Sequence, residues 1–570
     1  MQKSWWLGLL WMGVLFGDEL NLDEIRAASV ASSEGVPLGI VNGVSVITGA
    51  YTEQVSDFEI PAIEPLPLTR SYISKQEKDH TPGQWCIRLD DSLQEVTDER
   101  ERLHALVKRP SGASILYDVS SQDGVYFRPH IPKGYTNASL AVGGKTNLKN
   151  HSLHRSKHGK RFILTTGDGT EFIYHHQEDP EYYELTEENR ASGLSFHHKG
   201  SSKQIVHQVR ALSRAKKLVG WMQEKKTHDK KEHRIIEGSD GSVCHYRFAP
   251  FKIDQYIHDQ GGKRHETHRI WMLVNVSSNR KPSTHYDYTH THDQKSWLLK
   301  KKSLPGGRFL SNEYYAPGKK WRYRKAQGFD KSLFRAKHRN ETDRVLCQEA
   351  PVGVDNTPIP IHRFCYWKSP PEQGRKKSKS PCTDVFDALW HKTRYTYSGK
   401  DRLLHILKYK GNHSYALYSK EELKWGEKGS SQEGHLLGKY LLNEKEEILG
   451  GQFFRYDKYG NATEKGVVGR LTGRPSAPIR FTKDRYTQGG EREVTIYVYS
   501  KDKLNFLESE HHSNGVSIHY QHPKGVDLLH GKITLFQGEV KHREFYSYDR
   551  HGALKEVIED DGLFFERNNL

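Results

Sequence analysis

The chain has few cysteines and no paired-cysteine motif. Its 570 residues contain five cysteines and no C-x-x-C spacing, so the sequence offers neither a zinc ribbon nor a thioredoxin-like redox centre. In an exported protein, one or two disulfides could form, and the odd count would leave one thiol over. The spacing does not assign pairs among Cys86, Cys244, Cys347, Cys365 and Cys382.

The common catalytic motifs are also missing. There is no G-x-S-x-G, no H-E-x-x-H, no G-x-x-x-x-G-K-[ST] and no Rossmann fingerprint. The densest histidine cluster is HYDYTHTHD at 285–293, where His290 and His292 would share one strand face with Asp287 and Asp293 nearby. A metal site is one interpretation, but solvated strand residues are favoured because the chain has 33 histidines. We expect no enzymatic activity, no cofactor and no metal.

Long apolar runs are absent beyond the N-terminus. Hydrophobic residues make up 35% of the chain and the mean hydropathy is −0.81. The apolar run from Trp5 to Phe16 follows Lys3 and precedes Gly17; it is too short to span a bilayer and suits a signal peptide. Leu15 makes the cleavage site imperfect. We expect a signal-peptide-like segment at 1–17, a linker or short helix at 18–35, no later membrane span, and a secreted or cell-surface location.

The charge is strongly basic but dispersed. The formal net charge is +16 and the pI is about 9.2, yet Lys and Arg occur in short scattered runs such as 300–302 and 375–377. A binding patch for nucleic acid needs clustering on one face, so nucleic acid is an unlikely partner. Aromatic residues reach 11% with 30 Tyr, which excludes a disordered chain and favours antiparallel sheet.

One short unit recurs towards the C-terminus. Each copy has an aromatic residue, any residue and Tyr, followed by Asp or Ser. In the two copies with Asp, a Gly lies three residues after the Asp. An Asp three residues before a Gly is typical of a type I turn, in which the carboxylate accepts backbone N–H groups. Asp as an acid or metal ligand is the alternative, but Ser398 and Ser500 replace it in two copies. The turn residues are Tyr456, Asp457, Gly460, Tyr548, Asp549 and Gly552, within FRYDKYG, YSYDRHG, YTYSGKD (395–401) and YVYSKDK (497–503).

A second unit, [Asp/Asn]-Gly-x4-Tyr, occurs three times, and the chain closes on a similar start, DGLFFER at 561–567. Asp-Gly and Asn-Gly are strong hairpin signals because both residues tolerate the positive φ of type I′ turns. The predicted hairpin turns are Asp168-Gly169, Asp240-Gly241 and Asn514-Gly515.

The N-terminal block completes a family resemblance. VNGVSVITGAY (41–51) predicts a turn that leads into a strand, and DFEIPAIEPLPLTRSY (57–72) is confined to extended conformations by its prolines. Together with the repeated units, this block resembles Rhs/YD-repeat proteins, in particular those of environmental chlamydiae, over residues 36–570. The matching positions are Ile60, Pro61, Pro65, Leu66, Leu68, Arg70 and Tyr72, followed by Gly83-x-Trp85.

The resemblance implies an all-β fold, a long antiparallel sheet of hairpins that spirals into a hollow shell. We expect an N-terminal β region at 36–135, a hairpin region at 136–340 and diverged YD repeats at 341–570, with an exposed basic loop at 366–383. Many relatives enclose a C-terminal toxin and release it by cleavage at an Asp-Pro motif. Here the one Asp-Pro pair, Asp179-Pro180, lies far from the C-terminus. We therefore expect the core and toxin regions to be missing. The chain would then be either the N-terminal part of a longer protein or a shortened paralogue.

Two functions follow as hypotheses. The first is a non-enzymatic, exported or surface-associated scaffold that encloses or presents a toxin or effector; its partners would be a C-terminal toxin or the remaining shell segments. The alternative is a cell-surface adhesin or carbohydrate-binding module, because Tyr, Trp and basic residues on a wet sheet face could bind a surface glycan.

Overall fold

The computed structural model describes residues 39–562, apart from 75–84, 88, 90–91, 98–102, 109–113, 122, 130–149, 157–158, 177–181, 200–206, 226–231, 260–261, 293–296, 316–342, 353–355, 368–379, 399–401, 411–415, 428, 474–476, 482–486, 502–503 and 561. The signal-like segment, the linker, most of the basic loop at 366–383 and most of the 561–567 hairpin lie outside the described residues. The described part contains thirty-nine strands and no α-helix. The predicted all-β class is confirmed.

The main sheet begins with a closed ring of eight antiparallel strands. Each strand pairs with the next, and β13 also pairs with β6 through Tyr183 opposite Leu93. The ring consists of β6 (Ser92–Thr97), β7 (Leu103–Lys108), β8 (Ser114–Val119), β9 (Tyr126–Pro129), β10 (Ser152–Arg155), β11 (Arg161–Thr165), β12 (Glu171–His176) and β13 (Tyr182–Asn189).

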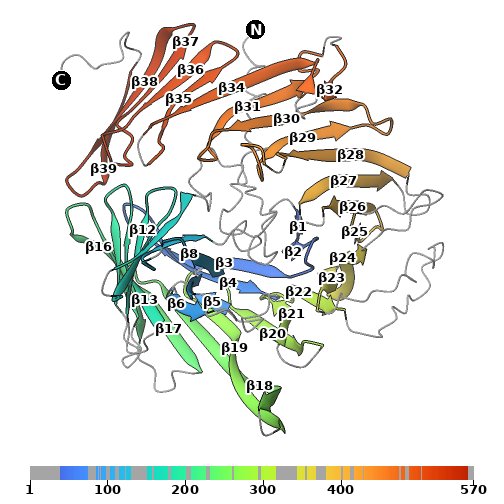
Figure 1. Cartoon of the computed structure of the whole chain (residues 1–570). Helices are drawn as coiled ribbons and strands as arrows, with labels where there is room; N and C mark the ends of the chain where they lie inside the picture. The colour runs from blue at the N-terminus through green and yellow to red at the C-terminus, as the bar shows by residue number, and fades with distance from the viewer. Residues whose placement is uncertain are drawn as a thin grey trace.

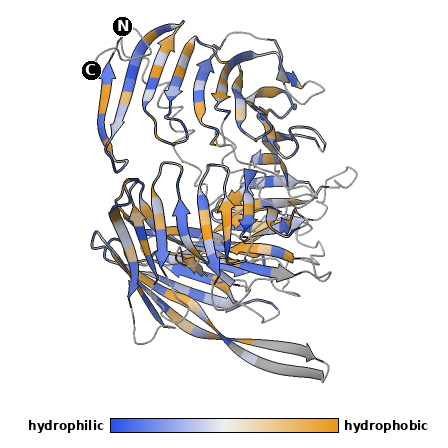
Figure 2. Cartoon of the chain, turned by 60° about the vertical axis from the view of Figure 1, so that its left-hand side comes forward, coloured by the Kyte–Doolittle hydropathy of each residue, from blue (hydrophilic) through white to orange (hydrophobic). Residues whose placement is uncertain are grey.

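From β13 the sheet continues as a curved ribbon of hairpins (Figure 1). Its first half comprises β14 (Ser195–Lys199), β15 (Gln208–Leu212), β16 (Leu218–Lys225), β17 (His233–Gly238), β18 (Val243–Asp259), β19 (Gly262–Ser278), β20 (Thr284–His290), β21 (Trp297–Ser303), β22 (Phe309–Tyr314), β23 (Val345–Val352), β24 (Thr357–Trp367), β25 (Cys382–Asp387) and β26 (Lys392–Tyr397). The long hairpin β18–β19 projects beyond the body of the sheet (Figures 1 and 2).

The second half of the ribbon curves back over the first strands, so that the molecule has two layers in Figure 2. It comprises β27 (Leu403–Lys410), β28 (Ala416–Trp425), β29 (Leu436–Leu442), β30 (Ile448–Tyr456), β31 (Ala462–Gly469), β34 (Glu491–Tyr499), β35 (Leu507–His512), β36 (Val516–Gln521), β37 (Gly531–Phe536), β38 (Glu539–Tyr548) and β39 (Leu554–Asp560). A small pair, β32 (Arg480–Phe481) and β33 (Thr487–Gln488), lies in the connection between β31 and β34.

The N-terminal block forms separate small sheets inside the curve of the ribbon (Figure 1). The pair β1 (Ile40–Val41) and β2 (Val44–Ser45) precedes the inner sheet of β3 (Thr52–Ile60), β4 (Leu66–Ile73) and β5 (Trp85–Ile87). The prolines at 61 and 65 lie in the connection between β3 and β4, where no ladder hydrogen bond is needed. Ile60, Leu66, Leu68, Arg70 and Tyr72 are all buried.

The main hydrophobic core lies between the inner sheet and the concave face of the ribbon. Strand β20 shows the alternation that produces it, because Tyr286 and Tyr288 are buried whereas His285 and Asp287 are exposed. Trp85 of the inner sheet packs against Tyr286 with the rings tilted by 52° and their centroids 4.9 Å apart. The ribbon needs few aliphatic residues because one of its faces remains wet.

Candidate functional site

The predicted YD turn at 457–460 is held by its aspartate. Asp457 Oδ1 accepts hydrogen bonds from the backbone N–H groups of Tyr459, at 2.8 Å, and Asn461, at 2.9 Å. The N–H of Gly460 donates to the Asp457 carbonyl, and Gly460 has a φ of 80°. A carboxylate engaged in this way stabilises a turn and is not poised for acid–base chemistry.

The second turn has the same geometry. Asp549 Oδ1 accepts the N–H groups of His551 at 2.7 Å and Ala553 at 3.0 Å, and Gly552 has a φ of 85°. Desolvation alone would raise the pKa of Asp549, but the backbone hydrogen bonds from Ala553 and His551 lower it below its usual value. In a third copy the Ser500 hydroxyl accepts the N–H of Phe506 at 2.8 Å, six residues on instead of two or four.

Two further turns of this kind escaped the sequence search. Asp387 Oδ1 accepts the N–H groups two and four residues on, both at 2.9 Å, and Asn443 Oδ1 does the same. The residues at the glycine position are Trp390 and Glu446, with φ of 66° and 63°. A pattern that requires Gly therefore misses them, whereas an Asp or Asn at the end of a strand would be a broader signal.

The tyrosines of the YD units have a role that the motif did not suggest. The hydroxyl of Tyr456 donates to the Leu436 carbonyl at 2.9 Å, and that of Tyr548 donates to the Leu529 carbonyl at 2.8 Å. Each carbonyl lies at or just before the start of the preceding strand, and each tyrosine follows a register shift in the ladder. The ring covers the concave face while the hydroxyl satisfies a backbone group near the bulge.

The same tyrosine bond occurs at positions that the sequence analysis did not single out. Tyr314 donates to the Leu299 carbonyl at 2.8 Å, and Tyr366 donates to the Val345 carbonyl at 2.9 Å. Tyr366 ends an aromatic-x-Tyr sequence, FCY, that is not followed by Asp. The aromatic-x-Tyr pair alone is therefore the sequence signal that could have found this bond. Tyr499 repeats the bond with Ala462, whereas Tyr397 instead lies 3.4 Å from the Thr383 hydroxyl.

The three predicted hairpin turns lie between consecutive strands, but not as type I′ turns. Gly169, Gly241 and Gly515 have φ of 76°, 80° and 87°, whereas the residues before them do not have positive φ. The type I′ expectation is therefore wrong for these turns. Asp168, Asp240 and Asn514 instead accept the N–H two residues on with a side-chain oxygen, which favours a right-handed conformation followed by a left-handed glycine.

Several of these turns meet across the two layers, at a contact line that we call the seam. The Asn150 side chain donates to the Tyr459 carbonyl at 2.7 Å, and the Ser213 hydroxyl lies 3.2 Å from His551 Nδ1; the partners are 309 and 338 residues apart. The N–H of Asp527 also donates to the Ala191 carbonyl at 3.1 Å. Turns on one rim of the early strands thus contact turns on the facing rim of the late strands.

The seam includes some of the predicted turns and excludes others. The turns at 457–460 and 549–552 lie in it, and Gly169 lies where an added Cβ would be 2.2 Å from a side-chain methyl of Leu504. The turn at 240–241 instead pairs with Arg280, which is 3.3 Å from Asp240. The turn at 514–515 contacts Gln537 of the neighbouring hairpin.

A buried ionic network joins the inner sheet to the ribbon. Arg70 Nε donates to both oxygens of Asp57, at 2.8 and 3.1 Å, and Nη1 donates to the Tyr286 hydroxyl at 2.5 Å. The Tyr246 hydroxyl donates to Asp57 at 2.7 Å, and the Arg70 guanidinium lies 4.6 Å from the Trp85 ring centroid. Burial raises the pKa of Tyr246, and the Asp57 carboxylate raises it further. The network therefore combines one ion pair with neutral phenols.

No metal or redox centre emerges from the described residues. They contain no group of three His, Cys, Asp or Glu side chains placed to hold a metal. His290 packs against Trp297 with ring centroids 3.6 Å apart, and the His292 N–H donates to Asp343. The five cysteines are buried, and none of them forms a disulfide.

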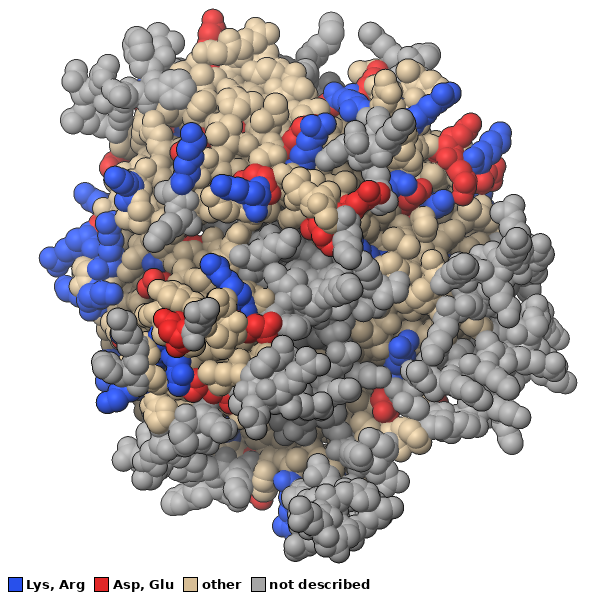
Figure 3. Space-filling model, viewed as in Figure 1, with Lys and Arg blue, Asp and Glu red and all other residues tan. Residues whose placement is uncertain are grey.

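Charged side chains on the face seen in Figure 3 are interspersed, apart from a basic group at its left side. On β27–β29, Lys408 and Lys439 both contact Glu421, at 3.1 and 3.0 Å. Such pairs fit the solvated surface expected from the scattered basic runs. Within the described residues, no helix is long and apolar enough to cross a membrane.

Comparison with known proteins gives a family for the N-terminal block alone. A domain of unknown function, DUF6531, matches residues 41–117. This range contains β2 to β7 and most of β8 and includes the whole inner sheet. No curated protein matches the sequence.

Solved structures resemble the chain at low sequence identity. TcdB2-TccC3-TEV is 12% identical over 91% of this chain and 23% of its own length, with a TM-score of 0.33. The N-terminal domain of the effector protein SpvB from Salmonella typhimurium is 10% identical over 46% of this chain and 95% of its own, with a TM-score of 0.20. The Photorhabdus luminescens Tc holotoxin pore is 10% identical over 84% and 26%, with a TM-score of 0.15. This chain thus spans about a quarter of the two toxin-complex chains, and these values are too low to assign a function.

Proposed function

We propose that the chain is a non-enzymatic, exported scaffold of the Rhs/YD-repeat type, whose sheet encloses or presents a toxin or effector. The observation that carries the proposal is the seam, where turns 309 to 338 residues apart contact each other. A sheet that returns on itself in layers forms a wall with an inside and an outside. Such a wall suits the shielding of another polypeptide better than catalysis at a single pocket.

The register of the late strands assigns their residues to an inner and an outer face. Phe454 is buried and lies opposite Lys465, so both belong to the concave face. Arg455 and Glu464 lie opposite each other on the other face and form an ion pair at 3.3 Å. The outer face thus carries this charge pair beside a buried apolar cluster of Tyr440, Leu442, Phe453 and Val468, whereas the inner face carries Phe454, which packs into the main core.

Enclosure can be tested with cysteines introduced on neighbouring residues of β34. Thr495 lies opposite Lys465 and faces inward, whereas Ile496 lies opposite Glu464, faces outward and is 51% exposed. We expect Ile496→Cys to react with both N-ethylmaleimide and a polymer-linked maleimide. Thr495→Cys should react with the small reagent alone, and its equal reaction with the polymer reagent would contradict enclosure. The native cysteines are buried and provide a low background.

Export rests on residues outside the described part and needs its own test. Residues 1–40 fused to a secretion reporter should carry the reporter out of the cytoplasm. Strict cytosolic retention of the fusion would contradict the exported half of the proposal and leave the enclosing half intact.

A further inference from the structure

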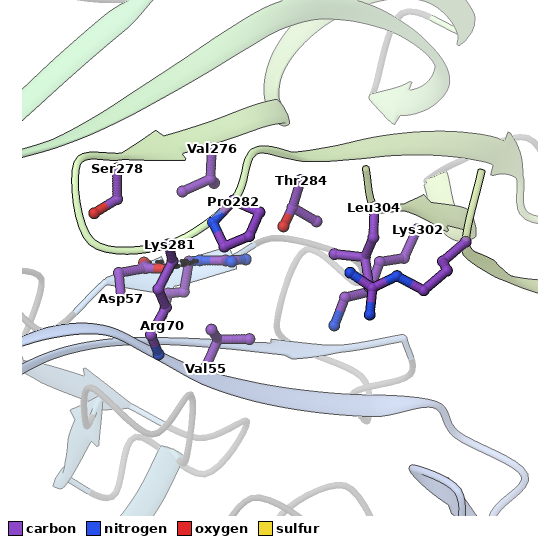
Figure 4. Close-up of a pocket in the computed structure, with 11 residues that line it drawn as sticks. Val55, Asp57, Arg70, Val276, Ser278, Lys281, Pro282, Thr284, Lys302 and Leu304 are labelled. Atoms are coloured by element: carbon purple, nitrogen blue, oxygen red, sulfur yellow. Dashed lines mark hydrogen bonds and ion pairs between the residues drawn. The ribbon is translucent and has the colours of Figure 1, made fainter. Parts of the chain in front are cut away.

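A half-open cavity of about 230 Å³ lies between the inner sheet and the ribbon. Figure 4 shows Val55, Asp57 and Arg70 of the inner sheet on one side, and residues of the β19–β20 loop, including Lys281 and Pro282, on the other. The β21–β22 hairpin closes one end. The cavity is therefore built by the inner sheet and by two neighbouring segments of the ribbon that are far from it in sequence.

Positive charge exceeds negative charge around this cavity. Its lining includes four cationic side chains, Arg70, Lys281, Lys302 and Arg308, and one carboxylate, Asp57. Asp57 pairs with Arg70. Lys302 contacts Glu53, just outside the lining, at 2.5 Å. Two of the four cations are thus neutralised.

Lys281 and Arg308 have no carboxylate partner among the described residues. The Lys281 ammonium donates to the Ser56 carbonyl, and Arg308 Nε donates to the Pro305 carbonyl at 3.3 Å. Both are exposed at the mouth of the cavity. Backbone carbonyls satisfy part of their hydrogen-bonding capacity and leave both charges free to attract an anion.

The remaining walls are largely apolar. Val55, Val276, Pro282 and Leu304 line the cavity together with the cations. A fully hydrated inorganic ion gains nothing from such walls, whereas an alkyl or aryl group would be removed from water on them. Binding sites of this kind combine an apolar lining with a few polar groups that fix orientation.

We propose that this cavity binds a small organic anion, a carboxylate or a phosphate ester with a short apolar group. Lys281 and Arg308 contact the anionic head, and the valine, proline and leucine walls contact the apolar group. The site is independent of the proposed scaffold function, because it depends on the junction of the inner sheet and the ribbon rather than on the seam.

Calorimetric titration of the full chain tests the ligand class. The probes are hexanoate, its neutral analogue hexanamide, phenyl phosphate and inorganic phosphate. We expect saturable binding of hexanoate or phenyl phosphate, and at least tenfold weaker binding of hexanamide and inorganic phosphate. Hexanoate alone would assign a carboxylate and phenyl phosphate alone a phosphate ester, each supporting the proposal. Equal binding of hexanamide, or no saturable binding of either organic anion, would overturn it.

Charge-removing variants locate the site. Lys281→Gln and Arg308→Gln should each weaken binding of the organic anion about tenfold, because each removes a charge-assisted hydrogen bond. Lys524→Gln removes the same charge at an exposed turn away from the cavity and should leave binding unchanged. Both substituted cations are exposed, so the variants should keep the wild-type circular dichroism spectrum. Unchanged binding in the Lys281→Gln, Arg308→Gln double variant would refute this assignment.

Discussion

Removal of the Tyr456 hydroxyl should loosen the hairpin that it closes. Tyr456→Phe keeps the ring on the concave face and deletes the donor to the Leu436 carbonyl, a bond of 2.9 Å between buried residues. The loss of one hydrogen bond costs a net of about 1 kcal/mol, and leaving its buried carbonyl without a donor raises the cost to about 1–3 kcal/mol. We therefore expect local opening to become easier by about 1–2 kcal/mol, which is roughly a 5- to 30-fold change in the opening equilibrium.

Hydrogen–deuterium exchange followed by mass spectrometry measures this change locally. The peptides to follow cover β29 and β30. One-step unfolding is typical of small domains only, and a global midpoint for a chain of this size would average over both layers. Exchange in these peptides should accelerate in Tyr456→Phe, while peptides from the β6–β13 ring should be unaffected.

A matched variant on the same turn serves as the control. Tyr459 is 43% exposed, and Tyr459→Phe removes a hydroxyl that has no hydrogen bond within the described structure. It should exchange like the wild type. Equal exchange in Tyr456→Phe and Tyr459→Phe would refute the claim that the tyrosine–carbonyl bond stabilises the YD unit.

Three other perturbations have defined outcomes. Gly460→Val places a β-branched residue at a φ of 80°; it should cost roughly 1–3 kcal/mol, seen as faster proteolysis at this turn, and unchanged resistance would contradict the turn geometry. Desolvation raises the pKa of Asp168, but hydrogen bonds from the Thr166 hydroxyl and the Thr170 N–H lower it overall. The contribution of Asp168 to stability is therefore present above the unfolded pKa of about 3.9 and is lost as the pH falls through the lower folded pKa. Asp168→Asn should remove this acid-dependent part of the protection of the turn from hydrogen exchange. Arg70→Met alone leaves the Asp57 carboxylate buried without its cation, which should lower the free energy of unfolding in urea by about 3–5 kcal/mol. Adding Asp57→Leu should restore much of that stability. Wild-type stability of the single variant would show that the ion pair is dispensable.

Much of the local structure could be predicted from the sequence. The Asp457–Gly460 turn follows from the preference of Asp for backbone N–H groups and of Gly for positive φ. The fold class follows from abundant tyrosine and the hairpin units. Trp390 and Glu446 were not predicted, because they adopt positive φ although neither is a residue type that favours it. The feature that these turns share with the YD turns is the acceptor three residues earlier, Asp387 or Asn443, and not the glycine.

The seam and the inner sheet depend on the shape of the whole ribbon. Whether the turn at 549–552 reaches Arg214 is set by the twist and bulges that accumulate over the intervening strands. Each strand adds a small rotation, so the contact cannot be inferred from either turn alone. The burial of Arg70 likewise needs partners on β18 and β20, far along the chain.

Cross-linking across the seam tests the layered sheet most directly. Ala191 and Asp527 share a backbone hydrogen bond of 3.1 Å. The double variant Ala191→Cys, Asp527→Cys should therefore be joined within one chain by a short bis-maleimide reagent. The control pair, Ala191→Cys with Gly538→Cys, should not be joined. Gly538 lies in the turn between β37 and β38, at the rim of the late strands away from the seam. Efficient joining of the first pair alone is the predicted result. Equal joining of both pairs, or of neither, would contradict a sheet that returns on itself.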